Sequence, residues 1–165
     1  MNQTTTATAA PDKAALRNEL EATHAEYREL VGQITDGAWN AKSGNAGWTC
    51  GQLAWHLAEG VKFSSGLVMK TREGKQTNPP SFLLPLAFKA NEFIVRRKSR
   101  NATRESVLED YRTSLDELLR LLDDVREEEF SRSATNYGIT RTIEEMFRNT
   151  IEHFAEHGPE IRSAL

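Results

Sequence analysis

Apolar residues in this chain recur at steps of three, four and seven positions, which is the spacing of one face of an α-helix. No stretch alternates with a period of two for long enough to indicate a strand. The pattern predicts an all-α fold, most simply a four-helix bundle with a long crossover that carries an additional or shorter helix. The helical stretches cover about residues 12–35, 49–72, 81–98, 103–126 and 142–163.

Local signals place the ends of several of these helices. Thr49 with Gln52, and Thr142 with Glu145, have the spacing of a capping box, so helices are expected to start at Thr49 and Thr142. The segments TDGAWNAKSGNAGW and EEEFSRSATNYG are predicted to be loops. Pro159 lies inside the last helical stretch, where its ring predicts a kink or an end.

Length and composition indicate a single domain at residues 12–165 behind a disordered Thr/Ala-rich tail at 1–11. The net charge of −3 gives no reason to expect nucleic acid or an anionic membrane as a partner. The single cysteine, Cys50, excludes an intrachain disulfide, and no apolar run approaches the roughly 20 residues of a membrane span. The N-terminal residues do not resemble a signal peptide, so we expect a cytoplasmic protein.

Three of the four histidines are predicted to point into the bundle. With 100° per residue, His157 falls on the apolar face of the last helix and His153 at its edge. His56 shares the face of the second helix, while His24 lies at the margin of the first. That second-helix face is made up of Leu53, Leu57, Val61, Phe63, Leu67 and Val68.

Two histidines at i and i+4, with a third from a neighbouring helix, match the ligand number of catalytic metal sites. A polar patch in an imperfect core explains the same pattern equally well. A ferritin-like di-iron site is excluded, because it needs two Glu-x-x-His motifs and only Glu21–His24 has that order. Glu59 could hold an imidazole N–H, although a solvated glutamate is the simpler interpretation, and Cys50 reads as a small apolar filler.

The segments GWTCGQLAWHLAEG and IEHFAEHGPEIRSAL together resemble the second and last helices of the DinB-like superfamily. The resemblance extends over nearly the whole chain, with the same order of helices and a long link after the second. It implies a four-helix bundle that holds a divalent ion, typically zinc or nickel, on three histidines. Carried over to this sequence, those ligands are His56, His153 and His157.

The superfamily includes mycothiol- and bacillithiol-dependent transferases and isomerases. The resemblance therefore implies an enzyme that uses a low-molecular-weight thiol on a small-molecule substrate, and it also implies a homodimer. A metal-dependent hydrolase is the close alternative. A non-catalytic metal-binding or oligomeric bundle of the stress response is a second functional class. The sequence pattern does not indicate which residue would act as a catalytic base.

Overall fold

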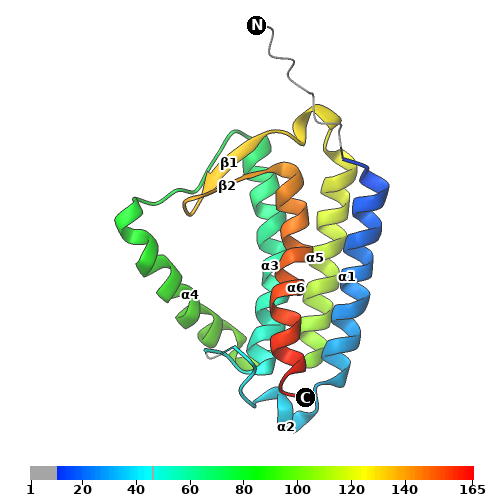
Figure 1. Ribbon diagram of the computed structural model, residues 1–165, viewed down its shortest axis with the longest axis vertical. Coiled ribbons are helices and arrows are strands. Elements are labelled where there is room, and N and C mark those ends of the chain that lie inside the picture. Colours follow the sequence, from blue (N-terminus) through cyan, green and yellow to red (C-terminus); the bar gives the residue numbers. More distant parts are fainter. Residues whose placement is uncertain (1–10, 46) are drawn as a thin grey trace, which may run out of the picture.

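Four long helices lie side by side in the computed structural model, which describes residues 11–45 and 47–165 (Figure 1). They are α1 (Lys13–Gln33), α3 (Cys50–Arg72), α5 (Arg104–Asp124) and α6 (Ile143–Arg162). Both α1 and α3 contact α5 and α6, so α1 and α3 occupy opposite corners of the bundle. The predicted four-helix bundle is confirmed, whereas all but the last residue of the predicted N-terminal tail lies outside the described residues.

The two helices α3 and α5 run in the same direction, and α1 and α6 run in the other (Figure 1). Parallel neighbours need a long connection, and the chain supplies it with α4 (Leu84–Lys98), which lies between the 3-10 turns η1 (Ser81–Leu83) and η2 (Ser99–Asn101). This is the predicted crossover helix. It stands away from the bundle along most of its length (Figure 1).

The core consists of the apolar faces that the helical spacing predicts. Leu53, Leu57, Val61, Leu67 and Val68 of α3 are all buried. Phe63 is an exception: its side chain is 48% exposed, so its predicted place in the core is wrong. Its direction is 200° from that of Val61, which puts it on the far side of the helix, beside Tyr137.

Both predicted capping boxes are present. The Gln52 N–H donates to Thr49 Oγ1 over 3.3 Å, and the Thr49 N–H donates to Gln52 Oε1 over 3.0 Å. Thr142 and Glu145 make the same reciprocal pair at the start of α6. These bonds satisfy amides that have no partner inside the helix, which is why the helices start where the sequence predicts.

A β-hairpin occupies part of a predicted loop, so the expectation of no strands is wrong. Strands β1 (Ser133–Asn136) and β2 (Ile139–Thr142) pair antiparallel around Tyr137 and Gly138. Both turn residues have positive φ, 53° and 81°, as two-residue hairpin turns require. The strands are too short and too polar for an alternation with a period of two to appear in the sequence. The hairpin turn is also bonded to the link that follows α3, because the Tyr137 N–H donates to the Thr77 carbonyl over 2.9 Å.

Two further differences concern helices. The loop predicted before α3 contains one helical turn, α2 (Asp36–Trp39), which the Thr35 side chain caps at Ala38. The last helix does not end at Pro159 but continues to Arg162. Pro159 removes only one backbone hydrogen bond close to the helix end, where the loss is small. No helix among the described residues is long and apolar enough to cross a membrane.

Candidate metal centre

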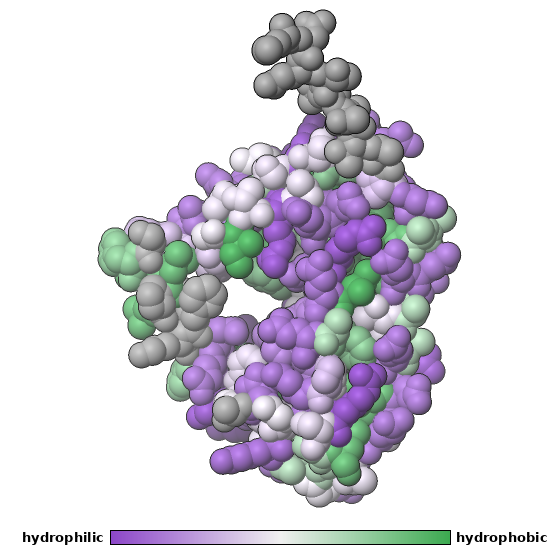
Figure 2. Space-filling model, viewed as in Figure 1, coloured by the Kyte–Doolittle hydropathy of each residue, from purple (hydrophilic) through white to green (hydrophobic). Residues whose placement is uncertain are grey.

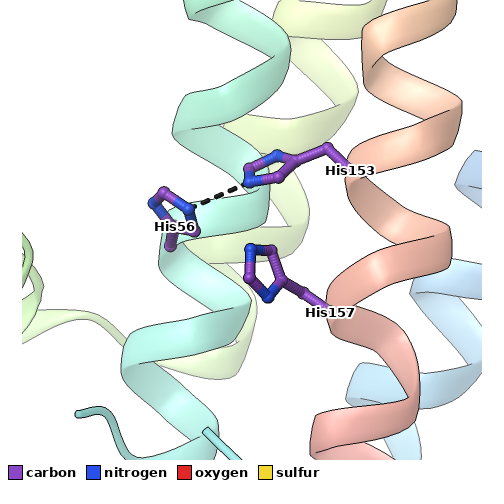
Figure 3. Close-up of side chains that lie close together, drawn as sticks. All are labelled: His56, His153 and His157. Carbon is purple, nitrogen blue, oxygen red and sulfur yellow. Dashed lines mark hydrogen bonds between the residues drawn. The ribbon is translucent and has the colours of Figure 1, made fainter.

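The three predicted histidines converge between α3 and α6. His56 extends from α3, and His153 and His157 extend from successive turns of α6, with their rings pointing toward one another (Figure 3). One ring nitrogen from each can be chosen so that all three lie within 4.8 Å of one another. In the part of the chain that the structure describes, no other group of three or more His, Cys, Asp or Glu side chains is so arranged.

Two of the nitrogens are spaced as ligands of one ion would be. His56 Nε2 lies 2.9 Å from His153 Nε2 (Figure 3). Two nitrogens bonded at about 2.1 Å to a common ion, at roughly a right angle, lie about 3 Å apart. The three ring pairs are T-shaped, with interplanar angles between 71° and 81°, so no two of the rings are stacked. The donor set therefore fits a divalent transition-metal ion with positions left for other ligands.

Burial keeps two of these rings neutral. Desolvation, reinforced by the neighbouring His157, lowers the pKa of His56 to about 4. Desolvation together with His56 and His157 lowers the pKa of His153 to about 3. A neutral imidazole offers a lone pair, which is the form that binds metal ions. At neutral pH His56 and His153 can therefore bind a cation without first losing protons.

Glu160 fixes the orientation of His157, and sequence reasoning missed it. Its carboxylate Oε2 lies 2.6 Å from His157 Nδ1, so Nδ1 carries the proton and Nε2 keeps its lone pair toward the other rings. The Asn45 side-chain amide donates to the same carboxylate over 3.3 Å. The signal was available, because a carboxylate three residues after a histidine lies on the same side of a helix.

Gly60 determines how closely α6 can bring His153 to α3. A Cβ atom at this position would lie 2.5 Å from His153 Nδ1 and 2.8 Å from its Cε1, which no side chain could occupy without moving the ring. Glycine inside a helix costs about 1 kcal/mol relative to alanine. A glycine four residues after His56, in the middle of a helix, was the sequence signal for this close approach.

The loop before α3 covers one side of the cluster. The Trp48 ring centroid lies 4.6 Å from that of His56 and 6.3 Å from that of His157. The loop is held to α6 by the Gly44 N–H, which donates to the Glu160 carbonyl over 2.7 Å. Trp48 therefore contributes to the burial that lowers the pKa of His56.

The remaining candidates lie outside the cluster. His24 stacks on Tyr111 with ring centroids 5.2 Å apart, and its Nε2 is buried without a partner among the described residues. Glu59 is half-buried and makes no hydrogen bond to the three rings. Cys50 is buried, which raises the pKa of its thiol, and it packs in the core as the predicted filler.

Comparison with known proteins identifies the family of this chain. The sequence model of the DinB superfamily matches residues 19–161. No curated protein matches the chain.

Two solved structures share the fold. YfiT from Bacillus subtilis, described as a probable metal-dependent hydrolase with an unusual four-helix bundle topology, aligns with a TM-score of 0.77 and 17% identity, over 99% of this chain and 91% of its own. A protein from Streptococcus pneumoniae aligns with a TM-score of 0.68 and 16% identity, over 96% and 92% of the two chains. At identities of 16–17%, the likeness to these two structures shows the fold alone. The family assignment depends instead on the sequence model, which matches most of the chain. The chain belongs to the DinB superfamily.

Proposed function

We propose that the protein is a metal-dependent enzyme that holds one divalent ion on His56, His153 and His157. The observation that carries the proposal is the approach of the three imidazoles, with two Nε2 atoms 2.9 Å apart in a buried setting that keeps their rings neutral. Zinc and nickel suit three imidazole ligands.

Hydrolysis is the reaction that we propose first. Three protein ligands leave positions for water and substrate, and a bound divalent ion lowers the pKa of water and polarises a carbonyl or phosphoryl oxygen. The chain's own residues hold and shield the site: Glu160 keeps His157 in the required tautomer, Gly60 lets His153 approach, and Trp48 covers His56. The description of YfiT as a probable metal-dependent hydrolase supports the same class.

The second candidate is transfer of a low-molecular-weight thiol to a small electrophile, because a thiolate is both a nucleophile and a soft metal ligand. Its support is the family membership alone. A non-catalytic role, in which the ion only stabilises the bundle, is the remaining alternative. We further propose that the protein acts in the cytoplasm on a small molecule, without nucleic acid or membrane.

The test begins with the metal content of the purified chain. We expect about one divalent ion per chain by elemental analysis, after incubation with zinc or nickel if needed. The loaded protein, the chelated protein and the His153→Ala variant are then compared on a panel of small esters, amides and phosphate esters. Hydrolysis by the loaded protein alone supports the proposal.

Calorimetry of the loaded protein with mycothiol, bacillithiol and glutathione separates the two enzyme classes. Metal-dependent binding of a thiol, with no hydrolysis of the panel, would favour the transferase. Failure of the protein to retain either metal would refute the site itself.

A further inference from the structure

The crossover helix α4, the hairpin turn and the link that follows α3 border a cavity of about 500 Å³. Leu83, Leu86 and Ala90 line it from η1 and α4, and their spacing of three and four residues places them on one side of the helix. Pro79 of the link and Tyr137 of the turn add to the apolar lining. Figure 2 shows an opening between α4 and the bundle. The cavity has the size of a small-molecule site, which is roughly 300–1,000 Å³.

The polar residues of the lining, Thr77 and Asn78, use much of their hydrogen-bonding capacity within the chain. The Thr77 N–H donates to Asn136 Oδ1 over 2.8 Å, and its carbonyl accepts from the Tyr137 N–H over 2.9 Å. Asn78 Oδ1 accepts from the Gly138 N–H over 3.1 Å. None of the described lining residues is charged. The cavity therefore favours a hydrocarbon group, because a polar or charged group placed there would lose its water without gaining equivalent partners.

Phe63 lies between this cavity and the histidine cluster. It follows His56 by seven residues on α3, so the two side chains point within about 20° of each other and are separated by about 10 Å along the helix. The Phe63 side chain is half-exposed, and its ring centroid lies 6.2 Å from that of Tyr137, which lines the cavity. An apolar path on the order of 15 Å long therefore leads from the cavity to the imidazoles.

We propose that the cavity binds the hydrocarbon chain of the substrate, an ester of a medium-chain acid whose carbonyl group lies at the histidine cluster. The end of the chain occupies the space beside Leu86, Ala90 and Tyr137, and the part nearer the carbonyl passes over Phe63. The position of the ester rests on the proposed hydrolysis, whereas binding of the chain to the cavity needs no metal ion. Chain length then determines specificity, because each methylene buried strengthens binding about fourfold.

Calorimetry of the metal-free, full-length chain with decanoate and butyrate tests the cavity. The two probes share a carboxylate and differ in chain length, so we expect decanoate to bind at least about 100-fold more tightly. Leu86→Asp should weaken decanoate binding at least about 10-fold, because it places a charge in the apolar lining. Asn91→Asp, exposed about 140° from Leu86 on the same helix, is the matched control and should bind decanoate as the wild type does.

A second variant fills the cavity without adding charge. Ala90→Phe places a large ring in the lining, so decanoate binding should again weaken about 10-fold or more. Since Leu86 is exposed in the free protein and Ala90 is half-buried, both lining variants should keep the helical circular dichroism of the wild type. Equal affinities for decanoate and butyrate, or equal effects of Leu86→Asp and Asn91→Asp, would overturn the proposal.

Hydrolysis of the octanoate and acetate esters of p-nitrophenol by the zinc-loaded protein tests the path from the cavity to the cluster. We expect kcat/KM to be at least about 10-fold higher for the octanoate ester, and Phe63→Ala should lower this ratio by about 10-fold. Met69→Ala, at an exposed residue of α3 about 140° from the direction of His56, is the control and should keep the ratio.

The two experiments distinguish failure of this inference from failure of the proposed function. Hydrolysis of both esters at equal kcat/KM would overturn the cavity as a substrate site and leave the hydrolase intact. Tight decanoate binding that Leu86→Asp and Ala90→Phe weaken, without hydrolysis of either ester, would support the cavity and refute the hydrolase.

Discussion

Two polar clusters lie at opposite ends of α3, and they differ in how their groups are satisfied. Near the end of the helix, the buried Glu129 carboxylate accepts hydrogen bonds from Arg72, Arg126 and Arg132 and from the Arg126 backbone N–H. Near its start, ring nitrogens of three imidazoles lie close together, and burial lowers the pKa values of His56 and His153. The first cluster supplies its buried carboxylate with donors from the chain itself, as a structural cluster does, whereas the second has nitrogen atoms that a cation could bind.

The largest expected effect is on metal binding by the histidine cluster. His153→Ala removes one of three ligands, so the affinity for zinc or nickel should fall at least about 1,000-fold, as measured by competition with a chelating dye. His24→Ala, at the histidine outside the cluster, should leave the affinity unchanged. Equal losses of metal affinity in both variants would mean that His153 and His24 do not differ in function, which would contradict the assignment of the histidine cluster as the metal site.

The structural cluster should respond in stability instead. Glu129→Gln keeps the shape but leaves three guanidinium groups without their carboxylate, so the free energy of unfolding should fall by about 2–3 kcal/mol. Urea denaturation of the metal-free protein measures this change. Metal affinity should stay within about twofold of the wild type. A loss of metal binding in this variant would show that the two ends of α3 are coupled.

The contact between Gly60 and His153 gives a finer test of the histidine cluster. Gly60→Ala should push the ring out of place and lower metal affinity about 10- to 100-fold. Gly66→Ala on the same helix has no atom within 4 Å of the added Cβ, so it should only stabilise the helix, by up to about 1 kcal/mol. Unchanged metal affinity in Gly60→Ala would indicate that His153 is not a ligand.

A smaller change is expected from Glu160. Glu160→Gln keeps a hydrogen-bond acceptor for His157 Nδ1 but loses the negative charge, so metal affinity should fall about 10-fold. Glu156→Gln, at an exposed position one turn earlier, is the control and should bind metal normally. If both variants match the wild type, Glu160 serves only to anchor Asn45 and its loop.

In the metal-free protein, the pH dependence of the free energy of unfolding distinguishes the Glu129 cluster from the histidine cluster. The Arg126 backbone N–H and the arginine side chains lower the pKa of Glu129 to about 2. Its contribution is therefore complete above about pH 4.5 and is lost as the pH falls toward 2. The pKa values of His56 and His153 are lowered to about 4 and 3, so these rings do not affect stability above about pH 6.5 and destabilise the fold progressively as the pH falls from there toward those values.

Denaturant titrations of the metal-free protein at several pH values measure both windows. Glu129→Gln should flatten the stability profile only below about pH 4.5, and His153→Ala should flatten it between about 6.5 and 3. A change in the pH dependence above about pH 4.5 in Glu129→Gln, or no change between about pH 6.5 and 4.5 in His153→Ala, would contradict the assigned pKa shifts.

The sequence predicted the bundle and the three converging histidines because both depend on helical periodicity. Leu53, Leu57 and His56 repeat on one face, and rotation alone places them inward. What the sequence could not predict depends on contacts between distant segments. The hairpin at 133–142 has no apolar alternation, and Asn45 reaches Glu160 only because the loop folds onto the end of α6.

For the proposed metal site, the absence of a side chain at Gly60 makes the separation of α3 and α6 a determinant of metal selectivity. Ions that differ in radius and preferred bond angle need different distances between His56 on α3 and the two histidines on α6. Residues along the seam between α3 and α6, none of them coordinating, could then tune which metal the protein prefers. An engineer wishing to exchange one ion for another would begin with the volume of these packing residues and keep all three imidazoles.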